Sequence, residues 1–320
     1  MNRLPPIIFG TSCLGNLYRE IPFETKTAIA AEWFKAFDHP VIDSAGKYGA
    51  GLALACIGQA LKALGKRDGD LTISVKLGWR RSRPLLEGEE PTFEPDAWKG
   101  LTWDAVQDIS REGIRRCFEE AARLLDGYGI GMVSVHDPDE FIAGGGAFAD
   151  ITGAYETLFE LKATGMGVES VGIGVKDWRV IRELWEHGIR FDWAMFACAP
   201  TLLSHPPELL DFVARLKDAG VTLIDSAVFN GGFLTGGEML DYRKADPVEQ
   251  AAAFAFRDRY LALCREFGID PAAPAVEYAF RLGFDAVALN TSSPCRILKN
   301  AAYATHTSPT AFWENLMPDA

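Results

Sequence analysis

The six cysteines of this 320-residue chain are scattered, and no two of them form a CxxC pair. They stand at positions 13, 56, 117, 198, 264 and 295. The chain also lacks an apolar run of the roughly 18 residues that span a bilayer. The apolar run in the opening MNRLPPIIFG is too short for a signal peptide. These absences exclude a disulfide framework and predict a cytoplasmic protein with reduced thiols and no membrane partner.

Motifs of several enzyme classes are missing. The segment after the first apolar run, FGTSCLGN, lacks the GxGxxG of a doubly wound dinucleotide-binding fold. No GxSxG, HExxH or phosphate-binding GxxxxGK[ST] sequence occurs, and no histidine pair follows an apolar run, so we expect no metal site. The net charge of −12, from 32 basic and 44 acidic residues, argues against a nucleic-acid partner.

Short apolar runs rich in Val and Ile alternate with amphipathic stretches from one end of the chain to the other. Such runs are typical of strands buried on both faces of a parallel sheet. We expect strands at residues 7–13, 41–45, 71–77, 131–137, 170–175, 193–199, 221–228 and 286–291. Between them, apolar residues recur every three or four positions and predict helices, for instance at 25–37, 52–64, 105–125 and 207–220. Glycine follows several helices, as expected at a helix end: Gly65, Gly165, Gly188 and Gly220.

Eight strand–helix units in one chain favour a (β/α)8 TIM barrel, an α/β fold, over a doubly wound sheet. We expect a single domain over residues 1–320. Three segments extend the minimal plan: a long irregular loop at 78–103, a glycine-rich loop at 230–247 and a C-terminal tail at 306–320. Long loops after barrel strands commonly carry function, although a solvated insertion is the simpler alternative for 78–103.

Four polar residues stand at the ends of three successive apolar strands. Asp43 lies in VIDSA and Tyr48 in the turn after it, whereas Lys76 and His136 close ISVK and VSVH. The C-terminal ends of barrel strands meet at one mouth, so we expect the four side chains to lie together. Taken singly, these residues have simpler structural explanations: Asp43 as a helix cap, Lys76 as a surface lysine and His136 as a satisfied polar group. Their joint occurrence at successive strand ends favours a catalytic site.

The chemistry of these four types is that of proton transfer at oxygen. A free tyrosine titrates near pH ~10, and an adjacent ammonium such as Lys76 favours the phenolate and lowers that pKa. A buried lysine needs a partner to stay charged, and Asp43 can supply it. His136 can hydrogen-bond a substrate oxygen beside Tyr48. A site that only moves a proton suits hydride exchange at a carbonyl, with the hydride carried by a cofactor.

The segments FGT, DSAGKYGAG, KLG, HDPD, GVKDW, DSAVFNGGFLTGG and TSSPCRILKN occur in this order along the chain. In these motifs nearly the whole chain resembles the aldo-keto reductase superfamily, and SAVFNGGFL is similar to its branch of fucose- and galactose-type aldose 1-dehydrogenases and pyridoxal 4-dehydrogenase. The resemblance implies an NAD(P)-dependent oxidoreductase acting on a carbonyl or hydroxyl substrate. It gives Tyr48 the role of general acid or base, Lys76 that of its pKa tuner, Asp43 that of the partner of Lys76, and His136 that of the substrate orienter.

The resemblance also implies where a nicotinamide dinucleotide binds, across the barrel mouth. The implied contacts lie after strands one, two, five, seven and eight: Thr11, Asp43, Lys176, Ser226, Val228, Gly231, Thr291, Ser292, Arg296 and Asn300. Gly231 suits close approach of backbone N–H groups to an anion, and Arg296 offers a guanidinium. Asn290 stands where NADP-preferring members commonly carry a basic residue, so NAD is favoured over NADP.

Two places depart from the family pattern. Lys176 and Asp177 replace the usual Asn or Ser-Asn after the fifth strand, and Pro200 stands near the place of an aromatic residue that stacks on the nicotinamide. Phe196 and Phe229 are candidate replacements for that residue. These departures support an alternative function, a cofactor-binding sensor or regulatory barrel with little turnover.

Aromatic residues are expected to wall the substrate site. Besides His136, we expect Tyr18 after the first strand and Trp79 at the start of the long loop to contact the substrate. Aromatic walls with scattered polar groups suit a sugar. The arginines at 80, 81 and 83 offer another possibility, recognition of a carboxylate or phosphate.

Overall fold

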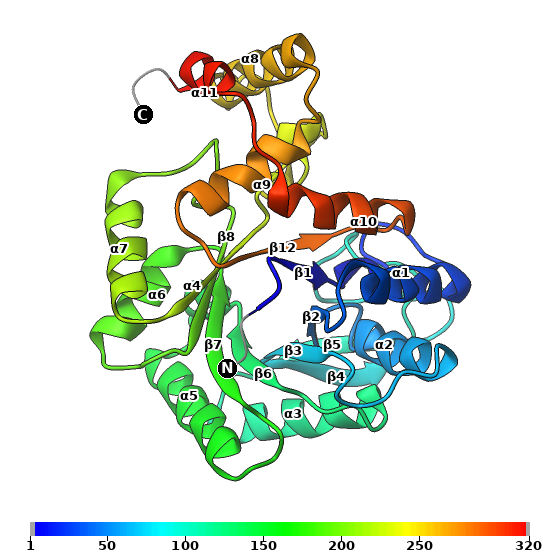
Figure 1. Cartoon of the computed structure of the whole chain (residues 1–320). Coiled ribbons are helices and arrows are strands. Elements are labelled where there is room, and N and C mark those ends of the chain that lie inside the picture. Colours follow the sequence, from blue (N-terminus) through cyan, green and yellow to red (C-terminus); the bar gives the residue numbers. More distant parts are fainter. Residues whose placement is uncertain (1–3, 318–320) are drawn as a thin grey trace.

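The computed structural model describes residues 4–317, and eight parallel strands form a closed barrel at its centre (Figure 1). Around the barrel the strands follow the order β1, β12, β9, β8, β7, β6, β3, β2, and β2 pairs with β1 to close it. Their bounds are β1 Ile7–Gly10, β2 Val41–Ala45, β3 Thr72–Leu77, β6 Met132–His136, β7 Ser170–Val175, β8 Trp193–Ala197, β9 Thr222–Ser226 and β12 Ala286–Asn290. All eight expected strands are confirmed, with the first ending three residues early.

Helices surround the barrel on its outside (Figure 1). They are α1 Phe23–Ala36, α2 Leu52–Ala63, α3 Arg111–Leu125, α4 Pro138–Ala143, α5 Phe148–Ala163, α6 Trp178–Glu186, α7 Pro207–Asp218, α9 Ala272–Arg281 and α10 Cys295–Ala302. The glycines expected after helices have positive φ, for example 64° at Gly65 and 79° at Gly220. No helix among residues 4–317 is both long and apolar enough to cross a membrane.

Alternation of side chains along the strands builds two apolar layers. Ile8 points into the barrel, where it packs with Trp193 and Ile224. Its neighbour Phe9 points outward and stacks on Trp33 of α1, with ring centroids 6.2 Å apart. Gly172 makes room for Trp193, because a Cβ there would lie 2.0 Å from the indole. The barrel interior is therefore a packed core, which leaves the strand ends to carry chemistry.

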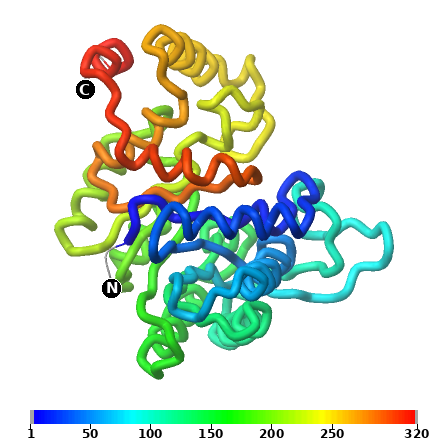
Figure 2. The backbone as a smooth tube through the Cα atoms, turned by 45° about the vertical axis from the view of Figure 1, so that its right-hand side comes forward, coloured from blue at the N-terminus to red at the C-terminus, as the bar shows by residue number. Residues whose placement is uncertain are grey.

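Residues 78–103 are not the irregular loop expected from sequence. Strand β4, Trp79–Pro84, pairs antiparallel with β5, Trp103–Gln107, and this hairpin projects from the side of the barrel (Figure 2). Its connecting segment, residues 85–102, is called the hairpin loop below. The helix expected at 105–125 begins only at Arg111, after Ser110, whose Oγ accepts the N–H of Gly113 at 2.9 Å. The expectation failed because the charged WRRSRP shows no strand pattern and pairs with residues 19 to 28 positions further along the chain.

The C-terminal tail docks at the periphery, where α8, Ala251–Phe267, and α11, Thr310–Leu316, lie together (Figure 1). Phe312 and Trp313 of α11 join a separate apolar cluster with Tyr260 of α8. Trp313 Nε1 also donates to Glu277 of α9 at 3.0 Å. Short elements complete the chain: 3-10 turns η1 Ser12–Gly15, η2 Phe233–Thr235 and η3 Tyr303–Thr305, and a small hairpin of β10 Met239–Leu240 with β11 Arg243–Lys244. Residues 318–320 of the expected tail lie outside the described part.

Candidate active site

Asp43 and Lys76 meet because β2 and β3 are paired neighbours in the barrel. Their register sets Asp43 against Ser74 and Ala45 against Lys76, so the two polar side chains point to the same side. Lys76 Nζ donates to the Asp43 carboxylate, and Ser74 Oγ donates to Asp43 Oδ1 at 3.2 Å. Burial lowers the pKa of Lys76, but Asp43 and Tyr48 outweigh this effect and raise it overall. The buried ammonium therefore stays protonated.

Tyr48 reaches the same ammonium from the turn between β2 and α2. Its phenol oxygen accepts from Lys76 Nζ at 3.2 Å. The turn packs closely against Gly15, where a Cβ would lie 2.6 Å from the Tyr48 carbonyl carbon. Burial raises the pKa of Tyr48; Lys76 opposes this shift, whereas Asp43 adds to it. The expected lowering of the Tyr48 pKa is therefore wrong for this arrangement, because desolvation is the larger effect and Asp43 offsets the charge of Lys76.

His136 completes the group from the end of β6. Its ring is edge-on to Tyr48, with centroids 5.5 Å apart, and the side chain is buried. Burial, together with the charges of Lys76 and Lys47, holds the pKa of His136 well below its usual value. The imidazole is therefore neutral at physiological pH. Its Nδ1 is enclosed in the protein and has no hydrogen-bond partner among the described residues.

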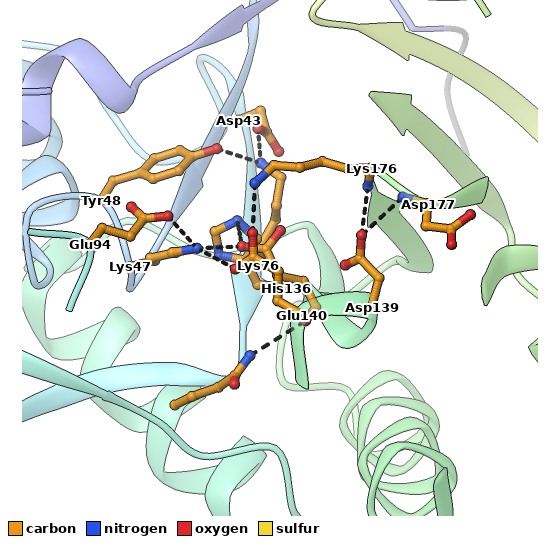
Figure 3. A network of polar contacts seen from close by, with 12 residues as sticks. Asp43, Lys47, Tyr48, Lys76, Glu94, His136, Asp139, Glu140, Lys176 and Asp177 are labelled. Atoms are coloured by element: carbon orange, nitrogen blue, oxygen red, sulfur yellow. Dashed lines mark hydrogen bonds and ion pairs between the residues drawn. The ribbon is translucent and has the colours of Figure 1, made fainter. Parts of the chain in front are cut away.

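A second charged group, which sequence reasoning missed, lies beside these four residues (Figure 3). At its centre is Lys47, which is 3% exposed. Its Nζ lies 2.7 Å from Asp137, 2.8 Å from Glu94 and 2.9 Å from Glu140. These three carboxylates come from positions 47 to 93 residues further along the chain, so only the position of Lys47 beside Tyr48 could have drawn attention to it.

The hairpin forms an aromatic wall beside the mouth. Trp98, in the hairpin loop, lies 5.9 Å from the Tyr48 ring between centroids. Phe93 bridges Trp98 and Trp79, at 6.3 and 5.9 Å. Tyr18 is 48% exposed, and its backbone N–H donates to Ala97 of the same loop at 2.6 Å. The hairpin loop thus connects Tyr18 and Trp79 to Tyr48, whose ring lies beside His136.

The three arginines of the hairpin bond to acceptors of the hairpin itself or of the segments next to it. Arg80 Nε donates to Asp108 at 2.7 Å and Arg81 Nε to the Ala50 carbonyl at 2.9 Å. Arg83 pairs with Glu89 within the hairpin. Each of the three guanidinium groups therefore already has an acceptor within the protein.

A model of the Aldo/keto reductase family matches residues 6–316. The chain belongs to the aldo/keto reductase family. It is 28% identical over 331 residues to a pyridoxal 4-dehydrogenase of Microbacterium luteolum, covering 96% of this chain and 91% of the relative. It is 26% identical to a D-threo-aldose 1-dehydrogenase of a Pseudomonas species, covering 98% and 93%. The expected membership is confirmed, and the protein is an oxidoreductase of a family that uses nicotinamide cofactors.

Solved structures of the family share the fold. A glycerol dehydrogenase of Gluconobacter oxydans superposes with a TM-score of 0.71 at 17% identity, over 99% of this chain and 94% of that structure. The holo form of an aldo-keto reductase of Bacillus halodurans gives 0.68 at 20% identity, over 98% and 91%. At such identities the likeness shows the barrel, and the site must be argued from this chain's own residues.

The loop after β9, expected to hold a pyrophosphate in this aldo/keto reductase, turns back on itself. Gly231 and Gly232 have φ of 74° and 95°, and a Cβ on Gly232 would meet open space. Ser226 Oγ donates to the Phe196 carbonyl at 2.8 Å, and Val228 is buried in the main core. The Gly232 N–H already donates to the Phe229 carbonyl at 3.0 Å, and a Cβ on Gly231 would lie 3.0 Å from the Tyr242 backbone nitrogen, so the open space in this loop lies beside the Cα of Gly232.

The segment after β12 carries the other expected cofactor residues. Thr291 and Ser292 lie in the turn that precedes α10, and Arg296, in its first turn, is exposed. Asn300 is buried at the end of this helix. Arg19, which sequence reasoning missed, crosses from the β1–α1 loop and donates to Ser292 Oγ. Thr11 lies below, fully buried, with its hydroxyl donating to the Asp43 carbonyl at 2.8 Å.

At the first departure from the family pattern, Lys176 and Asp177 contact the helix that follows β6. Lys176 Nζ pairs with Glu140 at 2.7 Å, while Asp139 accepts the backbone N–H groups of Lys176 and Asp177 at 3.2 and 2.9 Å. Phe196 is fully buried and packs edge-on against Phe284 in the helix layer, so it faces away from the mouth and cannot replace the missing aromatic residue.

Proposed function

We propose that this aldo/keto reductase exchanges hydride between a nicotinamide dinucleotide, NAD in preference to NADP, and a carbonyl or hydroxyl substrate, with Tyr48 as general acid and base. The observation that carries the proposal is the 3.2 Å contact between Tyr48 Oη and Lys76 Nζ, with Asp43 behind the ammonium. A phenol next to a permanently charged lysine can lose and regain a proton more easily than one in an apolar site.

The roles of the side chains follow from their charges. When a hydroxyl substrate is oxidised, Tyr48 as phenolate takes the hydroxyl proton; when a carbonyl is reduced, Tyr48 returns it. Lys76 stabilises the phenolate, and Asp43 keeps Lys76 charged. His136 is neutral, so its remaining N–H can donate to the substrate oxygen without competing for the proton. Bound nicotinamide supplies the hydride acceptor or donor.

The residues fit a dinucleotide at the rim of the barrel. Gly231 and Gly232 would approach its pyrophosphate, and Ser292 and Arg296 would hold its adenosine end. The exposed Asn290 contributes no positive charge toward a 2′-phosphate, which supports NAD. Arg19 and Arg296 leave the NADP alternative open to test.

The substrate class we infer is a sugar or an aromatic aldehyde. Both named relatives are dehydrogenases, one of pyridoxal and one of D-threo-aldoses. The half-buried rings of Tyr48 and Trp79 suit the apolar face of either compound, with the buried Trp98 packed against Tyr48, and His136 would supply a polar contact.

Tyr48→Phe tests the proposal against Tyr128→Phe, a matched change at a phenol that donates to the Lys66 carbonyl far from the site. The Tyr48 variant should lose about 100- to 10,000-fold in turnover of aldoses and aldehydes, the range of general acid–base catalysis. Both variants should bind NADH as the parent does, measured by energy transfer from tryptophan to nicotinamide. Parent-like turnover in Tyr48→Phe would refute the mechanism, and tighter binding of NADPH would refute the NAD preference. Cofactor binding without turnover on any substrate would favour a sensor.

A further inference from the structure

Lys47 is the most heavily partnered cation of the site, yet the proposed chemistry assigns it no role. Besides its three carboxylates, its Nζ lies 5.0 Å from the centre of the Trp79 ring. A buried ammonium that loses its partners is strongly destabilising, so its position in the structure is narrowly defined. The first Lys47 partner, Asp137, is itself only 6% exposed.

The partners of Lys47 come from two different segments (Figure 3). Asp137 and Glu140 belong to the turn and helix that follow β6, directly after His136. Asp137 Oδ2 lies 3.6 Å from His136 Nε2 and 2.7 Å from Lys47 Nζ. Glu94 belongs to the hairpin loop and also accepts from Trp98 Nε1 at 2.8 Å. Lys47 thus joins the segment behind His136 to the aromatic wall.

Apart from Lys47, the hairpin loop is joined to the barrel mouth through the β1–α1 loop, where the Tyr18 N–H donates to the Ala97 carbonyl and Asn16 Nδ2 donates to the Lys99 carbonyl at 3.0 Å. Its backbone meets the β1–α1 loop at Leu17 and Trp98, and the Lys99 N–H donates to the Asn16 carbonyl at 3.2 Å. These contacts are hydrogen bonds between two loops, neither of which is a barrel strand. Among the residues described, the Lys47–Glu94 pair is the charged contact that ties the hairpin loop to the strand-end residues beside Tyr48.

The net charge of the group around Lys47 supports a positioning role for this residue rather than a ligand-binding one. Lys47 and Lys176 carry two positive charges against the three negative charges of Glu94, Asp137 and Glu140. The cluster is therefore closed to an incoming anion, and its surplus charge is negative. An internally satisfied ion network restrains the segments that contribute to it.

We propose that Lys47 is a positioning residue that fixes the hairpin loop as the substrate wall beside Tyr48 and holds Asp137 against His136. The Lys47–Glu94 pair then sets how tightly substrate is held, and the Lys47–Asp137 pair sets the placement of the substrate oxygen. The kinetic part of this inference rests on the proposed function, whereas the structural part stands without it.

Glu94→Gln tests the wall, with Glu90→Gln as the matched control on the same loop. The Glu90 carboxylate is exposed and lies 3.8 Å from Lys99. Without substrate, Glu94→Gln should increase deuterium uptake at the Tyr18 and Lys99 amides, which bond across the two loops. With benzaldehyde and NADH, KM should rise about three- to fivefold, the effect of a partly exposed ion pair, while kcat stays within about twofold. Glu90→Gln should match the parent.

Lys47→Met and Lys47→Arg test the second contact. Lys47→Met should lower kcat as well as raise KM, because Asp137 loses its partner beside His136, and Lys47→Arg should recover most of kcat. Deuterium uptake in Glu94→Gln equal to that in Glu90→Gln would overturn the inference even if the methionine variant fails to fold. An arginine variant that folds but performs no better than methionine would do the same. A parent protein that turns over no aldehyde would instead refute the proposed function, and the exchange result would still decide whether Lys47 holds the wall.

Discussion

Replacing Asp43 with asparagine removes the carboxylate that pairs with Lys76 while leaving the shape of the site nearly unchanged. The two side chains are 5% and 7% exposed, so the Lys76 ammonium in the variant cannot reach bulk water without moving. It must then stay charged and unpaired or give up its proton. An ordinary lysine titrates near pH 10.4, and each pH unit is worth about 1.4 kcal/mol, so neutralising it at pH 7 costs about 4.6 kcal/mol.

We therefore expect Asp43→Asn to lower the free energy of unfolding by about 3–5 kcal/mol near pH 7, the range found when one member of a buried ion pair is removed. The loss should shrink as pH rises. In the variant the folded state has a depressed Lys76 pKa, so the unfolded chain binds one more proton and stability rises by about 1.4 kcal/mol per pH unit. In the parent the Lys76 pKa is raised, so both states are protonated below about pH 10 and this slope is absent.

Urea unfolding followed by tryptophan fluorescence at several values between about pH 7 and pH 9 measures both effects. Asp126→Asn is the matched control, since it removes the partner of Lys62 in a surface pair whose side chains are 65% and 51% exposed. That change should cost less than about 1 kcal/mol and show no added pH slope. A loss in Asp43→Asn as small as in the control, or one that does not change with pH, would refute the picture of a buried, Asp-dependent ammonium.

Two further predictions concern glycines. Gly15→Ala should reduce turnover with a smaller effect on cofactor binding, because its Cβ would lie 2.7 Å from the Tyr48 carbonyl oxygen and must displace the turn that carries the phenol; parent-like kcat would contradict this contact. Gly153→Ala, in the middle of α5 where a Cβ meets nothing within 4 Å, should instead raise the free energy of unfolding by about 0.5–1 kcal/mol in the same urea assay, and a decrease would show that the helix face is more crowded than described.

The barrel was predictable because each of its strands has a recognisable local sequence pattern. The segments VID, TISV and MVSV are short, apolar and β-branched, and a buried parallel strand needs little else. The hairpin was not predictable in the same way. WRRSRP is polar and contains proline, and its strand conformation depends on pairing with residues 103–107 and on acceptors such as Asp108. A strand stabilised by distant partners leaves no local pattern.

The order of motifs along the chain was enough to predict a barrel, a family and a strand-end set of acid, phenol, amine and imidazole. These features depend on residue types at fixed spacing, which the chain carries in itself. The tertiary structure alone decided the direction of the Tyr48 pKa, the engagement of the hairpin arginines and the centring of three carboxylates on Lys47. Burial and Coulomb interactions depend on which distant segments come within a few ångströms, and only the closed barrel brings those segments together.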